Sequence, residues 1–305
     1  MIPFFRGYSD IIPDFPLFYE SLKQPLPLNI RVNTLKIETW KLIEMLDEKG
    51  IQLVPMTDQK GTLFKASGLR SPGRLIEYFS GYIHPQALTS CLASLVLSPE
   101  PESFVLDMCA APGGKTSHLA QIMNNGGLII ANELYHSRHI PLAHTLSRLG
   151  VMNTLFTAYQ AQEFPMKQRF GYILADVPCS GEGRIRIRKE KYHGRWDRKP
   201  ETRYRLIDLQ KKIIIRGYDL LEDEGELVYS TCTYNPDENE AVVQFLLENR
   251  DAFLLPIETG FHHEPGITRW KGKSYEKQLV LTARFYPHQV DSVGFFMARI
   301  GRRKG

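Results

Sequence analysis

The sequence predicts an α/β protein with a doubly wound, mostly parallel sheet, closed by an antiparallel pair of C-terminal strands and preceded by a small N-terminal α+β module. Between residues 104 and 229, short apolar runs alternate with helical patterns, and such alternation requires crossover connections between parallel strands. Two later runs, at 279–285 and 293–300, have a turn that starts with Tyr286-Pro287-His288 between them, which suits a direct antiparallel return. The 305 residues, 43% of them apolar and 24% charged, are sufficient for a full globular core.

The N-terminal module is expected to span residues 1–80. Its pattern predicts a strand at 29–32, a helix at 39–48 that ends at Gly50, and strands at 52–55 and 63–65. The helix is expected to turn Trp40, Ile43 and Leu46 inward, with Leu42 as a further candidate for that face. An apolar-rich helix at 86–97 then leads into the larger domain, residues 81–305.

The same alternation predicts the strands and helices of the larger domain. Its predicted strands and helices, in chain order, are strand 104–108, helix 115–123, strand 128–133, helix 139–149, strand 153–157, strand 172–177, helix 204–221 and strand 226–229.

Composition excludes several classes of protein. The four cysteines are widely spaced and contain no C-x-x-C pair, so neither a disulfide framework nor a zinc site is expected. This usage is typical of a reducing cytosol, although a hyperthermophilic source would leave a disulfide open. The sequence shows no secretory signal pattern, and its apolar runs are far shorter than the ~20 residues that span a bilayer. We therefore expect a soluble, cytoplasmic protein, and nothing in the sequence demands more than a monomer.

The net charge of +4 is concentrated in one segment. Residues 184–205 contain ten Arg or Lys and only three acids, so the remainder of the chain is slightly acidic. Such a run is often only a solvated face. Here it begins directly after Cys179 and includes aromatic residues such as Trp196, which can stack on bases. Its position favours contact with the backbone of a nucleic acid.

A strand-to-helix loop, Asp107 to Thr116, has the features of a nucleoside cofactor site. Its Pro112-Gly113-Gly114 turn allows close backbone approach, and the helix that follows offers free N–H groups. The loop matches neither the dinucleotide nor the nucleoside triphosphate fingerprint. Glu133, at the end of the next strand, can accept hydrogen bonds from both ribose hydroxyls. A ribose without phosphates fits S-adenosylmethionine.

Two cysteines follow predicted buried strands: Cys179 in Asp176-Val177-Pro178-Cys179-Ser180 and Cys232 in Ser230-Thr231-Cys232-Thr233. Either one alone is more often a small core residue. If their strands are neighbours in a parallel sheet, however, both thiols emerge at its carboxyl edge, where such sheets bind ligands.

Two thiols beside a methyl donor suit methylation at carbon 5 of a pyrimidine. A thiolate that adds to carbon 6 turns the ring into an enamine, and carbon 5 then becomes nucleophilic. A carboxyl such as Asp176 can neutralise the charge that develops at N3, and a second cysteine can assist the final release. The residues alone do not say which cysteine attacks.

The chain resembles the Nop/Sun (RsmB/NOP) family of RNA cytosine-C5 methyltransferases over nearly its whole length. The matching pieces are Arg31-Val32-Asn33-Thr34-Leu35-Lys36, His84-Pro85-Gln86-Ala87 with Ser90, residues 107–116, residues 176–183, Ser230 to Thr233 with Tyr234-Asn235-Pro236-Asp237-Glu238-Asn239-Glu240, and Gly294-Phe295-Phe296-Met297-Ala298-Arg299. The resemblance implies a Rossmann-like class I methyltransferase fold.

The resemblance also implies roles for individual residues. Cys232 would be the nucleophile, Cys179 would help to release the methylated RNA, and Asp176 would face the cytosine edge. The cofactor S-adenosylmethionine would be held by Cys109, Ala110, Ala111, Pro112, Gly113, Gly114, Lys115, Glu133, Arg138, Gln160 and Asp176. RNA would be contacted by the N-terminal module, with Arg31 and Asn33, and by the basic segment, with Arg184, Arg186, Arg188 and Trp196. No metal is implied.

The chain departs from the family pattern at two places. Gln160 stands where relatives carry an acid that reads the adenine amine, and the stretch 184–188 departs from the usual spacing.

The compact design is closer to relatives that modify tRNA, while rRNA stays open as a substrate. The alternative function is an RNA-binding assembly factor with weak or lost catalysis. An amino-group methyltransferase is disfavoured, because the chain has Asp-Val-Pro-Cys in place of Asp/Asn-Pro-Pro-Tyr/Phe.

Overall fold

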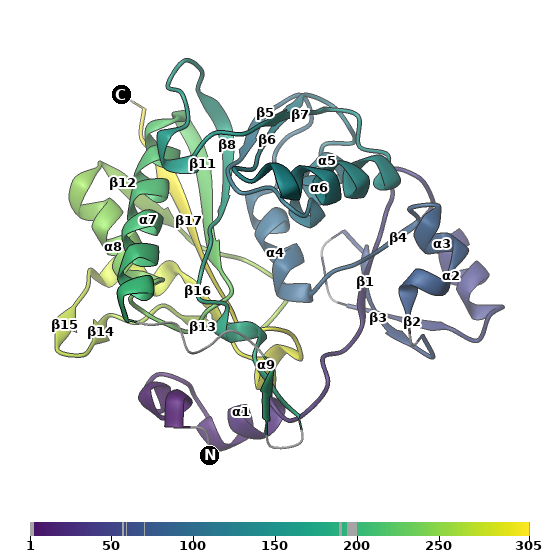
Figure 1. The fold of residues 1–305 in the computed structure, drawn as a ribbon, viewed down its shortest axis with the longest axis horizontal. Helices are drawn as coiled ribbons and strands as arrows, with labels where there is room; N and C mark the ends of the chain where they lie inside the picture. Colours follow the sequence, from purple (N-terminus) through teal and green to yellow (C-terminus); the bar gives the residue numbers. More distant parts are fainter. Residues whose placement is uncertain are drawn as a thin grey trace.

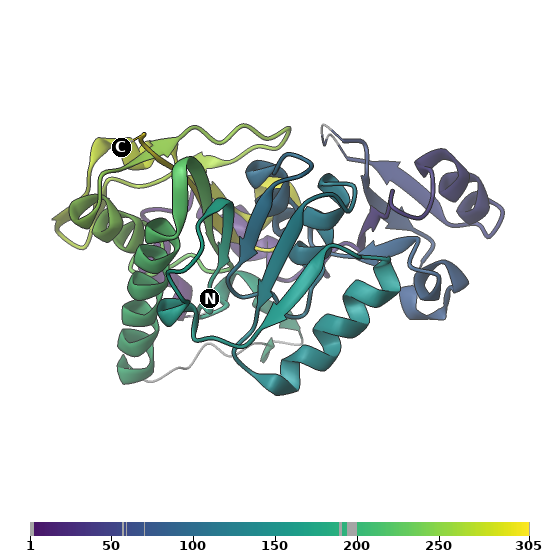
Figure 2. The same cartoon turned by 90° about the horizontal axis from the view of Figure 1, so that it is seen from above.

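The computed structural model describes residues 3–56, 58, 60–69, 71–188, 191–193 and 200–304. A large mixed sheet with helices on both sides forms the main body, and a smaller sheet with its own helices lies at one end of it (Figures 1 and 2). The chain begins on the main body, crosses to the small sheet and then returns (Figure 1).

The central strands of the large sheet are parallel, as the alternating pattern predicts. Among the described residues the strand order is β13-β16-β17-β11-β8-β5-β6-β7, with β12 paired to β17. The strands are β5 (Phe104–Asp107), β6 (Leu128–Asn132), β7 (Thr154–Thr157), β8 (Phe170–Asp176), β11 (Leu221–Thr231), β12 (Ala252–Leu255), β13 (Glu264–Pro265), β16 (Ala283–Phe285) and β17 (Phe295–Arg302). β17 pairs antiparallel with both β11 and β16, so the expected antiparallel C-terminal pair is confirmed.

Helices cover both faces of this sheet. α4, α5 and α6 lie on one side and α7 and α8 on the other (Figure 1). Their bounds are α4 (Leu88–Leu97), α5 (Gly114–Ile122), α6 (His136–Leu149), α7 (Pro200–Asp219) and α8 (Glu240–Asn249). Side chains alternate between the two cores: Leu174 and Val228 pack on the α4 side, whereas Ile173 and Leu227 pack on the α7 side. Burial on both faces explains why these strands are continuous apolar runs. α8 and β12 have no counterpart among the predicted elements.

The small sheet has the order β2-β3-β1-β4 and is antiparallel. It comprises β1 (Asn29–Val32), β2 (Gln52–Pro55), β3 (Leu63–Ser67) and β4 (Ile83–Pro85), with α2 (Thr39–Asp47) and α3 (Ile76–Phe79) beside it. Leu42 and Leu46 of α2 are fully buried, but Trp40 is 60% exposed. The expectation that Trp40 faces inward is therefore wrong, whereas the expectation that Leu42 and Leu46 face inward is confirmed.

The first residues of the chain pack on the main body rather than on the small sheet. α1 (Phe15–Ser21) lies near α9 (Pro287–Val290), as Figure 1 shows. Phe5 of the 3₁₀ helix η1 (Pro3–Tyr8) makes an edge-to-face contact with Phe18 of α1 at 5.6 Å. Phe18 of α1 makes edge-to-face contacts with Tyr234 and Tyr286, whose rings stack on each other at 5.9 Å. Such contacts between segments far apart in the sequence leave no local signal.

The remaining elements are short. They are η2 (Pro72–Arg74), η3 (Ala161–Glu163), η4 (Glu182–Arg184), β9 (Arg186–Arg188), β10 (Lys191–His193), β14 (Arg269–Trp270), β15 (Lys273–Ser274) and η5 (Lys277–Leu281).

Arg31 and Asn33 join the small sheet to the main body. Arg31 is fully buried, and its guanidinium donates to Ser117 Oγ at 2.7 Å and to Gln121 Oε1 in helix α5. Asn33 is 1% exposed and donates to the carbonyl oxygens of Gly81 and Leu149 at 2.8 Å each. The expectation that these two side chains contact RNA is therefore corrected, since both are enclosed in the junction between the sheets.

We expect Arg31→Met to lower the free energy of unfolding by about 3 kcal/mol, because the acceptors in α5 lose a buried charged donor. Burial lowers the pKa of Arg31 to about 10, so the guanidinium is charged at neutral pH. Urea denaturation measures the effect, with Arg74→Met as the control because Arg74 is exposed. If Arg31→Met changed the free energy of unfolding by less than about 0.5 kcal/mol, Arg31 would not be what joins the small sheet to the main body.

Candidate active site

The carboxyl ends of β5, β8 and β11 meet at one edge of the large sheet. β8 pairs in parallel with β5 on one side and with β11 on the other, and Asp176 is the register partner of Ser230. The loop after β8 carries Cys179 and the loop after β11 carries Cys232. The prediction that these strands are neighbours is confirmed, so both thiols lie at the ligand-binding edge.

The two thiols are in direct contact. Cys179 Sγ lies 3.3 Å from Cys232 Sγ and also accepts a hydrogen bond from the Cys232 backbone N–H at 3.3 Å. Both residues are half-buried free cysteines. The hydrogen bond from the Cys179 thiol lowers the pKa of Cys232 against the opposing effect of burial, and the same contact together with burial raises the pKa of Cys179. Cys232 is thus the thiol with the greater thiolate character, as a nucleophile requires.

Asp176 lies beside the thiols with both oxygens hydrogen-bonded. Lys115 Nζ is 2.7 Å from Oδ2, and Ser230 Oγ donates to Oδ1 at 2.8 Å. Burial alone would lower the pKa of Lys115, but the Asp176 charge outweighs it and the pKa is raised. Lys115 is therefore a cation at neutral pH, and it contributes to lowering the pKa of Cys232. The side chain of Asp176 is 30% exposed, which leaves it accessible from the edge.

The loop between β5 and α5 is held from within by Asp107. Its carboxylate accepts from Thr116 Oγ1 at 2.7 Å and from the Cys109 N–H at 3.3 Å. Burial raises the pKa of Asp107 to about 7. Gly113 has a φ of +100°, and a Cβ there would lie 3.1 Å from Leu142 Cδ1, so this turn requires glycine.

The other cysteines are placed for packing rather than chemistry. Burial raises the pKa of Cys109 well above its usual value, and it raises that of Cys91 to about 12. Neither thiol is activated.

Glu133 and Arg138 lie at the end of β6 and at the start of α6. Glu133 is 3% exposed; its Oε2 is 2.8 Å from Arg138, and its Oε1 accepts the Tyr135 N–H at 3.1 Å. Arg138 also donates to the Ala111 carbonyl at 2.6 Å, which ties the acid to the loop after β5. A near-buried carboxylate beside the glycine turn fits a ribose with two hydroxyl donors. The described residues therefore suit the nucleoside part of S-adenosylmethionine.

Gln160 lies in the loop after β7, next to Tyr159. It is exposed, and its side chain bonds to Glu163 at 3.0 Å and to Gln162 at 2.8 Å. Asn132, which sequence reasoning missed, holds the neighbouring backbone by donating to the carbonyls of Met108 and Tyr159 at 3.1 and 3.0 Å. The signal for Asn132 was an amide at the end of an apolar strand, adjacent to Glu133.

The basic segment is only partly described. Arg184 is exposed and near enough to Cys232 to lower its pKa. Arg186 is 7% exposed, and its guanidinium donates to the carbonyls of Ile185 and Ser292 at 2.8 and 2.9 Å. The expectation that Arg186 contacts RNA is therefore corrected, because its donors are used inside the fold. The side chain of Arg188 and all of Trp196 lie outside the described residues.

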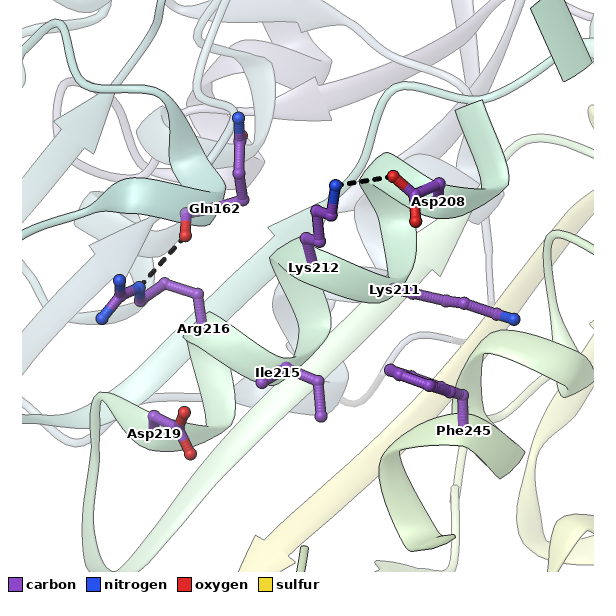
Figure 3. A pocket seen from close by; sticks show the side chains of 8 residues that line it. All are labelled: Gln162, Asp208, Lys211, Lys212, Ile215, Arg216, Asp219 and Phe245. Carbon is purple, nitrogen blue, oxygen red and sulfur yellow. Dashed lines mark hydrogen bonds and ion pairs between the residues drawn. The ribbon is translucent and has the colours of Figure 1, made fainter. Parts of the chain in front are cut away.

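A separate hollow of about 480 Å³ lies on the outer face of α7 (Figure 3). Lys211, Lys212 and Phe245 are among its lining residues, and Lys212 pairs with Asp208 at 2.7 Å. The described lining includes neither cysteine and no residue of the loop after β5. Because this hollow presents neither a thiol nor the glycine turn, the thiol edge is the candidate active site.

Two further features are absent from the described part of the chain. No helix there combines the length and apolar character needed to cross a bilayer. No group of three or more His, Cys, Asp or Glu side chains in those ranges is arranged to hold a metal ion.

The strand order, the glycine turn after β5 and the acid after β6 define a Rossmann-like class I methyltransferase. A crystal structure of a methyltransferase homolog protein from Pyrococcus horikoshii superposes with a TM-score of 0.85 at 33% identity, covering 98% of this chain and 93% of that one. A model of the family described as 16S rRNA methyltransferase RsmB/F matches residues 94–301. The chain therefore belongs to the RsmB/F methyltransferase family.

Individual relatives differ in length. The chain is 36% identical to the tRNA (cytosine(49)-C(5))-methyltransferase of Pyrococcus abyssi, covering 95% of this chain and 92% of that protein. It is 34% identical to the 28S rRNA (cytosine-C(5))-methyltransferase of Mus musculus, covering 95% of this chain but only 38% of that protein.

The raised pKa of Asp107 predicts a pH-dependent contribution to stability. The folded chain retains a proton that the unfolded chain releases, so this contribution is full below about pH 4 and is lost as the pH rises through about 7. Asp107→Asn removes the dependence. Relative to wild type, we expect the variant to gain roughly 2 to 3 kcal/mol between pH 5 and pH 8. Urea denaturation at both pH values measures this, and exposed Asp208→Asn should show no such gain.

Proposed function

We propose that this protein transfers a methyl group from S-adenosylmethionine to carbon 5 of a cytosine in RNA. The observation that carries the proposal is the 3.3 Å contact between two thiols beside a carboxylate that is held by a lysine. Family membership supports it, because relatives of both tRNA and rRNA type bear names for this reaction. An amino-group methyltransferase would have no use for the second thiol.

Each group has a role in the proposed reaction. The Cys232 thiolate bonds to carbon 6 of the ring, and the electron pair displaced from the C5–C6 double bond makes carbon 5 nucleophilic. The bound cofactor supplies an electrophilic methyl group. Asp176 and Lys115 face the polar edge of the base and balance the charge that develops there. A base then removes the proton from carbon 5, the double bond re-forms and the Cys232 thiolate is expelled.

Cys179 is proposed to assist the last stage. Its raised pKa keeps it as a thiol, so it can donate a hydrogen bond to the sulfur of Cys232 as negative charge returns there. A thiol in contact with the leaving sulfur is suited to this task. Cys109, in contrast, belongs to the loop that is proposed to hold the cofactor.

We also propose contacts to the cofactor and to RNA. The proposed cofactor contacts are the loop after β5, Glu133 and Arg138, while Gln160 would read the adenine through an uncharged oxygen. The exposed Arg184 and the surface of the small module are proposed to contact RNA. tRNA is the favoured substrate, because the match with the archaeal tRNA methyltransferase covers both chains almost completely. rRNA is the second candidate.

We expect Cys232→Ser to abolish methyl transfer, because a serine hydroxyl ionises far less readily than a thiol at neutral pH. Transfer of radiolabelled methyl from S-adenosylmethionine to RNA that lacks the modification measures the loss. Bisulfite sequencing of the product of the wild type identifies carbon 5 of cytosine as the acceptor. Activity in Cys232→Ser would reject the nucleophile assignment, and no activity in the wild type would favour an assembly factor.

We expect Cys179→Ala to form the first covalent bond but to release it slowly, so that protein accumulates attached to RNA. A denaturing gel after incubation with cofactor and RNA shows the adduct as a slowly migrating band. The double variant Cys179→Ala/Cys232→Ala is the matched control and should give no band. A band in the double variant would assign the bond to another residue.

A further inference from the structure

Two buried acids lie between the loops that carry the thiols. Glu182 follows Cys179 in the chain and Glu238 follows Cys232, and their side chains are 1% and 2% exposed. The reaction proposed above uses neither of them. Burying two carboxylates in one network is unfavourable, since burial and the neighbouring Glu238 raise the pKa of Glu182 to about 7. Packing alone therefore does not explain their burial, and such groups often serve a neighbouring site.

Each acid accepts a hydrogen bond from the loop that carries the other acid. Glu182 Oε2 accepts a hydrogen bond from Thr233 Oγ1 at 3.0 Å, and Thr233 directly follows Cys232. Glu238 Oε2 accepts from the Ser180 backbone N–H at 2.8 Å, and Ser180 directly follows Cys179. Each loop thus supplies the acid that holds the residue next to the other loop's cysteine.

Direct bonds between the loops complete this arrangement. Ser180 Oγ donates to Thr233 Oγ1 at 2.8 Å, and the Gly183 N–H donates to the Cys232 carbonyl at 2.9 Å. A Cβ at Gly183 would lie 2.1 Å from the Gly294 carbonyl oxygen, so only glycine permits this approach. The loops are consequently in contact along their length around the thiols.

Each acid is also anchored to a separate part of the fold. Gln210 of α7 donates to Glu238 Oε2 at 3.0 Å and to the Pro178 carbonyl at 2.9 Å. Tyr8 of the N-terminal segment donates to Glu182 Oε2 at 2.9 Å. Both anchors reach the site from segments that carry none of the proposed catalytic groups.

We propose that Glu182 and Glu238 form a reciprocal carboxylate clamp, in which each acid is a positioning residue that keeps the Cys179 and Cys232 sulfur atoms in contact. The inference deepens the proposed function and rests on it for its catalytic meaning. The sulfur–sulfur contact itself is a property of the fold and is measurable without RNA.

The clamp has a chemical consequence at Cys232. The Cys179 thiol stabilises the Cys232 thiolate only while the two loops stay together. A shift of the loop by an ångström removes that hydrogen bond and also takes Cys179 away from the leaving sulfur. Loss of the clamp should therefore reduce the thiolate fraction of Cys232 and the turnover rate, without altering the cofactor loop, which is built from β5, α5 and β6.

The test uses Glu238→Gln and Thr233→Val in the full chain. The rate of alkylation of Cys232 by iodoacetamide is measured against pH by mass spectrometry, with neither RNA nor cofactor present. We expect the midpoint of this profile to move upward by about one pH unit in both variants. Cys179→Ala, which deletes the hydrogen-bond donor, should move it in the same direction. Glu248→Gln, which changes an exposed acid on α8, is the matched control and should leave the profile unchanged.

Steady-state kinetics gives the second readout. We expect kcat to fall about tenfold to a hundredfold, while KM for S-adenosylmethionine stays within about twofold of wild type. Unchanged alkylation profiles in both folded variants would overturn the clamp, as would loss of the fold in both, since the acids would then be structural only. If circular dichroism shows that only Glu238→Gln is unfolded, the alkylation profile of Thr233→Val decides whether the clamp exists. A shifted profile in a protein that does not methylate RNA would support the clamp and reject the proposed reaction.

Discussion

The parallel register between β8 and β11 determines the whole arrangement at the carboxyl edge. Asp176 and Ser230 are partners in this register, and the Val177 N–H continues the ladder to the Ser230 carbonyl at 3.1 Å. Directly beyond this point both chains leave the sheet as loops. A slip of one residue would turn Asp176 toward a hydrophobic core and move Cys179 away from Cys232, because side chains alternate between the faces of a strand. The packing of Leu174 and Val228 on one face and of Ile173 and Leu227 on the other prevents such a slip.

Several of the charges near this edge are paired with a charge of opposite sign. Lys115 balances Asp176, and Arg138 balances Glu133. A third pair, Arg284 with Glu240 at 2.5 Å, is almost fully buried, and Arg284 also donates to the Tyr234 carbonyl at 3.1 Å. Through the Tyr234 carbonyl, this pair holds the loop after β11 in place. Breaking a buried pair leaves an uncompensated charge, so these contacts hold the loops more firmly than surface ion pairs would.

The small sheet is attached close to the loop that is proposed to hold the cofactor. Arg31 reaches Ser117 in the first turns of α5, the helix that begins directly after that loop. The module proposed to contact RNA and the loop proposed to contact the methyl donor therefore share one rigid helix. Nearer the start of the chain, Tyr8 contacts Glu182 and so reaches the Cys179 loop. The N-terminal residues thus support the site from two directions.

Much of the fold was predictable from local patterns. Continuous apolar runs identified the buried parallel strands, and glycine at 113 identified the turn into α5, because these features depend on residues that are neighbours in the sequence. The alternation of strands and helices also placed both cysteines at one edge. α8 and the packing of η1 and α1 on the main body were not foreseen, because their stability comes from contacts with distant segments.

For the site, the sequence by itself determined the chemical groups available: two thiols, Asp176 and a glycine turn followed by an acid. Only the tertiary structure decided which charged residues face solvent and which are enclosed. Arg31, Asn33 and Arg186 have the side chains of nucleic-acid contacts, yet their donors are used by carbonyls and hydroxyls of other segments. Glu182 and Glu238 resemble surface acids in the sequence but are buried between two loops. Burial depends on which segments pack against a residue, and that is a property of the whole fold rather than of any local stretch.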